Sequence, residues 1–137
     1  MNQPSDSPAA IAALQSATRD LLYLSESDEP FEIVHPGELA QPFGAGDACR
    51  VAKRTTDCRV QEQRLEEFFG ELAQERAWHG ASEKETVRRY RALWHSFLDH
   101  LADPKVFRVG EIQVDIIIVG KTADGHWIGV KTRAIET

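Results

Sequence analysis

Near its C-terminal end the chain reads IQVDIIIVGKTADGHWIGVKTRA from Ile112 to Ala134, and this stretch decides the fold. It contains two runs in which apolar residues recur at every second position, which is the spacing of a half-buried β-strand. The Asp124–Gly125 pair between the runs is typical of a tight hairpin turn. Ile117 and Val119 make the first strand apolar on both faces at its end, so we expect a central strand. The two runs are Ile112, Val114, Ile116 and Ile118, and Ile128, Val130, Thr132 and Ala134.

Two helices are predicted upstream of the hairpin. Residues 65–72 place four apolar side chains (Leu65, Phe68, Phe69 and Leu72) at the spacing of one helix face. Further on, Ser82 with Glu85 predicts a capping box, and an apolar helical stripe follows over about four turns. Pro104 stops this helix, since proline cannot continue one.

The first part of the chain predicts a helix, a turn and a strand. A serine followed by a proline at Ser7 is typical of a helix start, and apolar residues then share one face to about Leu24. SESDEP at 25–30 is a run of short polar residues closed by a proline and predicts a turn. FEIVH at 31–35 alternates as a strand does.

The middle of the chain has the weakest pattern. Residues 36–57 predict mostly loop with a short strand near Val51, and residues 55–61 fit a strand. Helices followed by antiparallel strands indicate an α/β fold, a sheet covered by helices on one or both faces. We expect a single domain over 1–137, with 1–7 flexible.

Charge excludes two classes of partner. The 137 residues are 42% apolar, enough for one core, and carry a formal net charge of -6. Such a chain is a poor ligand for nucleic acid or an anionic membrane. The acidity is concentrated in residues 1–47, which hold eight acidic residues against one basic residue.

Cysteine usage and the N-terminal sequence indicate a cytoplasmic location. Cys49 and Cys58 match neither a zinc nor a redox motif, which favours reduced thiols. The first residues have no basic region and no long apolar run, so we expect no secretory signal. No run of eighteen apolar residues is present, so we expect no transmembrane span.

Motifs of catalysis are scarce. The glycines of GAG at 44–46 make only a partial dinucleotide fingerprint, and no pair of histidines has i, i+4 spacing for a metal. Arginines 88, 89 and 91 fit a solvated helix face, and we expect no cofactor and no enzyme activity. Two features remain open: Trp78 as a core residue or an exposed anchor, and the acidic turn 25–30 as an ordinary turn or a ligand for a basic or metal-bearing cleft.

Two blocks resemble the nuclease A inhibitor family, whose members inhibit a sugar-nonspecific ββα-metal nuclease. They are LLYLSESDEPFEIV at 21–34 and VFRVGEIQVDIIIVGKTADGHWIGVKTRAIET at 106–137. The resemblance implies an α/β/α sandwich with a largely antiparallel sheet. It also implies a non-enzymatic protein that occludes the active site of a DNA/RNA nuclease in a one-to-one complex.

The same resemblance implies the site residues. Glu26 and the C-terminal Thr137 match the family residues that reach the Mg²⁺ of the nuclease, so this chain alone would hold no metal. Trp78 matches a tryptophan of the family interface, but Ala77 stands where the family has an aspartate. Two other hypotheses stay open: an interaction module of the same fold whose partner is not a nuclease, and a small hydrolase.

Overall fold

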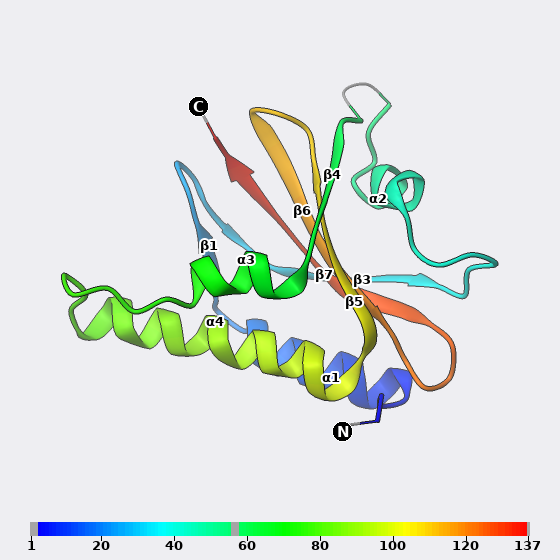
Figure 1. Ribbon diagram of the computed structural model, residues 1–137, viewed down its shortest axis with the longest axis horizontal. Helices are drawn as coiled ribbons and strands as arrows, with labels where there is room; N and C mark the ends of the chain where they lie inside the picture. Colours follow the sequence, from blue (N-terminus) through cyan, green and yellow to red (C-terminus); the bar gives the residue numbers. More distant parts are fainter. Residues whose placement is uncertain (1–2, 56–57, 137) are drawn as a thin grey trace.

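A five-stranded antiparallel sheet in the order β3-β7-β6-β5-β4 forms the centre of the structure, and β1 and β2 form a separate hairpin (Figure 1). The computed structural model describes residues 3–55 and 58–136. The helices are α1 (Ser7–Thr18), α2 (Ala45–Val51), α3 (Leu65–Leu72) and α4 (Ala81–His100). The strands are β1 (Leu22–Leu24), β2 (Asp28–Pro30), β3 (Glu32–Gly37), β4 (Val60–Gln63), β5 (Ala102–Val109), β6 (Gln113–Lys121) and β7 (Trp127–Ile135).

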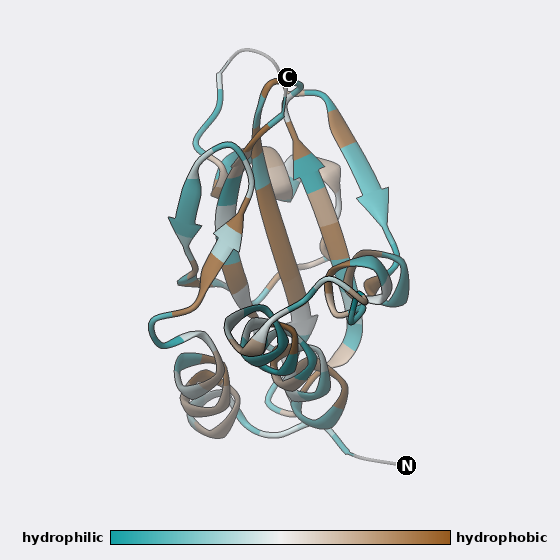
Figure 2. Cartoon of the chain, turned by 90° about the vertical axis from the view of Figure 1, so that its left-hand side faces the viewer, coloured by the Kyte–Doolittle hydropathy of each residue, from teal (hydrophilic) through white to brown (hydrophobic). Residues whose placement is uncertain are grey.

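The predicted C-terminal hairpin and its central strand are confirmed. β6 pairs with β7 without a register shift from Gln113 opposite Ile135 to Lys121 opposite Trp127. β6 lies in the middle of the five strands, and its consecutive residues Ile116 to Ile118 are fully buried on both faces. The middle strands of the sheet carry long brown, apolar stretches in Figure 2. The α/β class and the antiparallel sheet are therefore confirmed.

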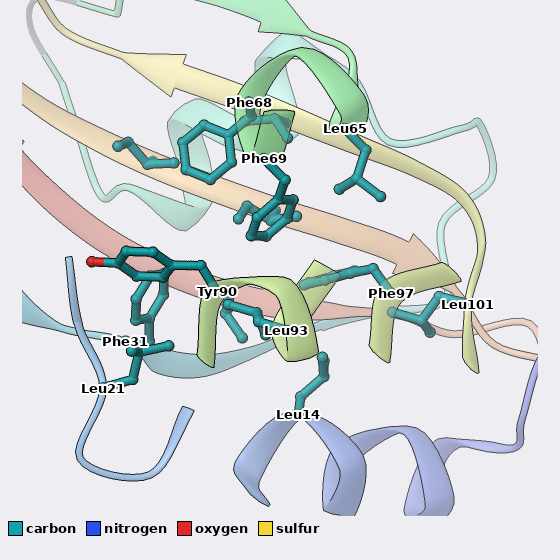
Figure 3. Packing of buried hydrophobic residues seen from close by; sticks show 14 of the residues in the cluster. Leu14, Leu21, Phe31, Leu65, Phe68, Phe69, Tyr90, Leu93, Phe97 and Leu101 are labelled. Atoms are coloured by element: carbon teal, nitrogen blue, oxygen red, sulfur yellow. The ribbon is translucent and has the colours of Figure 1, made fainter. Parts of the chain in front are cut away.

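Alternate residues of the sheet belong to two separate hydrophobic clusters. Ile116 and Ile118 pack in a cluster with residues of α1, α3 and α4, where Leu14, Phe69, Leu93 and Phe97 converge (Figure 3). Ile117 and Val119 instead pack with Phe43 and with Ala48 of α2. The strand must be apolar on both faces for this reason.

The predicted helix from Ser7 to Leu24 is too long. α1 ends at Thr18, and Asp20 adopts a φ of 58°, which breaks the helix before Leu22 begins β1. The cap is Asp6, whose carboxylate accepts a hydrogen bond of 3.1 Å from the Ala9 amide. Short polar side chains at this position satisfy a free N–H of the first turn.

Part of the N-terminal stretch expected to be flexible is bonded to the rest of the fold. The main-chain amide of Ser5 donates to the carbonyl of His100 at 2.8 Å. The Ser7 hydroxyl donates to the Asp124 carboxylate at 2.9 Å. Hydrogen bonds from the hydroxyls of Thr122 and Ser7 hold the pKa of Asp124 below its usual value. α1 is thereby tied to the β6–β7 turn.

Other boundaries differ from the prediction in the middle of the chain. Residues 45–51 form α2 rather than loop and strand, β4 starts at Val60, and β5 was not predicted. The capping box of α4 involves Gly80 and Glu83 rather than Ser82 and Glu85: the Glu83 carboxylate accepts from the Gly80 amide at 2.7 Å. α4 ends at His100, before Pro104, as predicted.

Candidate functional site

The acidic turn is the tip of the β1–β2 hairpin. β1 and β2 pair from Leu22 opposite Pro30 to Leu24 opposite Asp28, which leaves Ser25, Glu26 and Ser27 in the turn. The predicted turn is confirmed, although its last three residues form β2. The Glu26 side chain is exposed.

One hydroxyl group fixes the shape of this turn and its position on the sheet. Ser25 Oγ donates to the Ser27 carbonyl at 2.7 Å and accepts from the Ser27 amide at 3.3 Å. The same atom accepts from the amide of Ile135 at 3.2 Å. A serine hydroxyl has one proton and two lone pairs, so these three bonds use its full capacity. The turn that carries Glu26 is thereby bonded to the end of β7, two residues before Thr137 in the sequence.

The base of the hairpin is anchored to the core. Tyr23 stacks on Phe68 with ring centroids 6.0 Å apart, and the Tyr90 hydroxyl donates to the Leu22 carbonyl at 2.7 Å. Burial raises the pKa of Tyr90 to about 12, since the charged phenolate is poorly solvated there. On the β2 side, the Thr132 hydroxyl donates to the Pro30 carbonyl at 3.0 Å. The hairpin is therefore held at both its strands.

A second loop meets the end of β7. The Glu136 amide donates to the Ile112 carbonyl at 2.9 Å, and the Glu136 carboxylate forms an ion pair with Arg108 of β5. Burial of Arg108 opposes its charged form, but the contact with Glu136 outweighs this effect and raises the pKa of the guanidinium. We call the group of residues Ser25–Ser27, Ile112 and Ile135–Glu136 the terminal edge.

Two exposed apolar side chains flank the acidic part of the terminal edge. Leu24 is 54% exposed on β1, and Ile112 is 60% exposed just before β6. The period-two pattern predicts Ile112 as an inward-facing strand residue, which is wrong because β6 begins at Gln113. A group of exposed apolar side chains is a feature of protein-interaction surfaces.

The predicted site residues are only partly brought together. The Glu26 turn lies at the terminal edge, and Thr137 lies outside the described residues. Trp78 is 75% exposed, so the core alternative is wrong, and its ring contacts His79 at 4.3 Å between centroids. It belongs to the α3–α4 connection, a separate loop on the same left-hand side of the molecule in Figure 1 as the hairpin tip. Trp127 is buried, as a strand residue should be.

The arginines of α4 are structural. Arg88 pairs with Glu85, whereas Arg89 donates to the Arg19 carbonyl at 2.6 Å and Arg91 to the Ala73 carbonyl at 3.0 Å. The cluster therefore joins α4 to two loops and is not the purely solvated face that the sequence predicts.

The described parts of the chain, residues 3–55 and 58–136, hold no group of three or more His, Cys, Asp or Glu side chains suited to a metal ion. Partial burial and the neighbouring Cys58 raise the pKa of Cys49 to about 11, which disfavours the nucleophilic thiolate. Within the same ranges, no helix has the length and apolar character to cross a membrane.

Comparison with known proteins finds one matching family. A family model described as nuclease A inhibitor-like protein matches residues 8–137, nearly the whole chain. No curated protein matches the chain.

Proposed function

This chain belongs to the nuclease A inhibitor-like family, and we propose that it inhibits a Mg²⁺-dependent, sugar-nonspecific nuclease by occluding the active site in a one-to-one complex. The family implies a nuclease inhibitor and hence a protein partner. The α/β/α arrangement of the helices, the cytoplasmic location and the lack of enzyme activity belong to the same proposal.

The hydrogen bond between Ile135 and Ser25 is the observation that carries this mechanism. It joins the turn bearing Glu26 to a strand end only two residues from the terminal carboxylate of Thr137 in the sequence. A nuclease cleft holds Mg²⁺ and basic side chains that stabilise scissile phosphate oxygens. Carboxylates of Glu26 and Thr137 would occupy these positions in place of phosphates, with the metal supplied by the nuclease.

Trp78 and the charge distribution have separate roles in this proposal. The exposed indole of Trp78 would be a second anchor of the interface, since tryptophan is enriched among residues that dominate binding energy. The acidic first third, with eight acidic residues against one basic residue, would accelerate encounter with a DNA-binding cleft. Salt should therefore slow association more than it changes dissociation.

The test is inhibition of a purified ββα-metal nuclease by the full chain and by three variants. Glu26→Gln and deletion of Thr137 should each weaken inhibition by at least about tenfold while leaving the melting temperature nearly unchanged. Glu62→Gln, which removes an exposed carboxylate from β4, is the matched control and should inhibit normally. Equal inhibition by all four proteins would contradict the mechanism. Absence of inhibition by the unmodified chain would favour an interaction module with another partner.

A further inference from the structure

Two histidines that are 91 positions apart in the sequence meet on the sheet. His35 Nε2 lies 3.3 Å from His126 Nδ1, and the ring centroids are 5.4 Å apart. His126 directly precedes β7, and His35 lies between Val34 and Gly37, where the register of β3 against β7 shifts. Such an irregularity re-aims a side chain out of the regular strand pattern.

The separation of these two nitrogens fits a tetrahedral metal. Two imidazole nitrogens that each lie about 2.0–2.1 Å from zinc at the tetrahedral angle are about 3.3–3.4 Å apart. His35 is exposed and the side chain of His126 is 31% exposed, so an ion from solution can reach both rings.

The other nitrogen of His126 faces a carboxylate. His126 Nε2 lies 3.4 Å from Glu38 Oε1. A carboxylate that accepts from the second ring N–H orients a metal-bound imidazole and makes its ligating nitrogen more basic. The contact thus leaves Nδ1, the nitrogen that faces His35, as the atom available for a metal.

We propose that His35 and His126 bind a borderline transition-metal ion, Zn²⁺ or Cu²⁺, with Glu38 as the outer-shell partner of His126. Imidazole suits these ions, whereas Mg²⁺ and Ca²⁺ prefer oxygen ligands. Water occupies the remaining coordination positions. When the metal binds, the proton on His35 Nε2 moves to Nδ1 of the same ring, so that both histidines bind as neutral imidazoles. The ion leaves the core unchanged and links β3 to β7 from outside.

This site is independent of the proposed inhibition. β7 runs from Trp127 beside the histidines to Ile135 at the terminal edge, and Figure 1 shows the β6–β7 turn and the end of β7 on opposite sides. Nine strand residues span roughly 30 Å. Metal binding can therefore be measured without any nuclease.

The experiment is calorimetric titration of the tag-free full chain with ZnCl₂ and, separately, CuCl₂, followed by electron paramagnetic resonance of the copper complex. We expect saturable one-to-one binding, nitrogen hyperfine coupling from two imidazoles, and no heat of binding with MgCl₂. His35→Ala and His126→Ala should each lower the affinity at least tenfold, and Glu38→Gln should lower it by a smaller factor because Glu38 is 77% exposed.

The matched control is His95→Ala, which removes an exposed histidine from α4 and should leave the affinity unchanged. A second control is Cys58→Ser, since exposed thiols also bind these ions. Absence of saturable binding would overturn the proposal. Binding that survives both His35→Ala and His126→Ala, or that is lost in Cys58→Ser, would overturn it as well.

Discussion

The amide of Ile135 and the hydroxyl of Ser25, 110 positions apart, share a hydrogen bond of 3.2 Å. We expect Ser25→Ala to weaken nuclease inhibition about tenfold, because the turn loses all three bonds to Oγ and Glu26 is no longer held. Stability should fall by only about 1 kcal/mol, since the turn is at the surface. Inhibition constants and urea unfolding of the same protein separate the two effects, and inhibition that falls only in step with stability would contradict a positioning role.

The two exposed apolar side chains at the terminal edge, Leu24 and Ile112, should contribute to binding as well. Replacing Ile112 or Leu24 by serine is expected to cost about 1–2 kcal/mol of binding energy, because each side chain would be buried in the complex. Leu98→Ser is the matched control, because Leu98 is a comparably exposed aliphatic residue on α4, 49% against 54% for Leu24. Isothermal titration with the nuclease measures all three, and an equal loss in the control would show that the effect is not local.

A buried carboxylate on β6 should be important for stability. Asp115 is 1% exposed and lies 2.9 Å from Arg54 Nε and 3.4 Å from Arg133 Nε. We expect Asp115→Ala to reduce the free energy of unfolding by about 3–5 kcal/mol, because it removes the buried carboxylate beside the Arg54 guanidinium, whose side chain is only 15% exposed. Glu111→Ala, which removes an exposed pair with Arg59, should cost less than about 1 kcal/mol in the same urea titration. Similar losses for both variants would contradict this explanation.

Tyr90 makes stability sensitive to alkaline pH. Its folded-state pKa of about 12 lies above the ordinary value of 10.0, so the folded protein favours the neutral phenol. This stabilisation is complete below pH 10 and is lost as the pH rises through about 12, a total of at most about 2–3 kcal/mol. Tyr90→Phe should therefore lose less stability over this interval, as measured by urea unfolding at several pH values. Parallel pH profiles for the two proteins would rule out Tyr90 as the titrating group.

The sequence predicts the helices and strands whose apolar residues are also the ones that are buried. β6 and β7 are rich in apolar residues and are buried over most of their length, and α3 has a clear apolar face. α2 has no such stripe, because only Ala48 is buried and the helix begins in a glycine-rich segment. β5 is hard to predict because it contains Pro104 near its start and because its buried residues begin only at Val106.

The sequence predicts single residues of the candidate site but not which of them lie together in the fold. Glu26 and Trp78 are visible through their neighbours in the sequence, whereas the contact of Ser25 with Ile135 depends on the pairing of distant strands. The exposure of Ile112 is also hard to predict, because the alternating pattern includes this residue in the strand whereas β6 begins one residue later, at Gln113. The meeting of His35 with His126 also requires the register shift of β3 against β7.

β7 is hydrogen-bonded to a neighbouring strand on each side. At its end, the amides of Ile135 and Glu136 donate to the β1–β2 turn and to the β5–β6 loop, respectively. A ligand segment held this way has little conformational freedom left to lose, so the entropic cost of association is small for the part up to Glu136. Binding should then proceed as docking of preorganised surfaces, with backbone shifts of about 1 Å or less in this protein. The affinity of the complex should then be set mainly by its rate of dissociation rather than by folding upon contact.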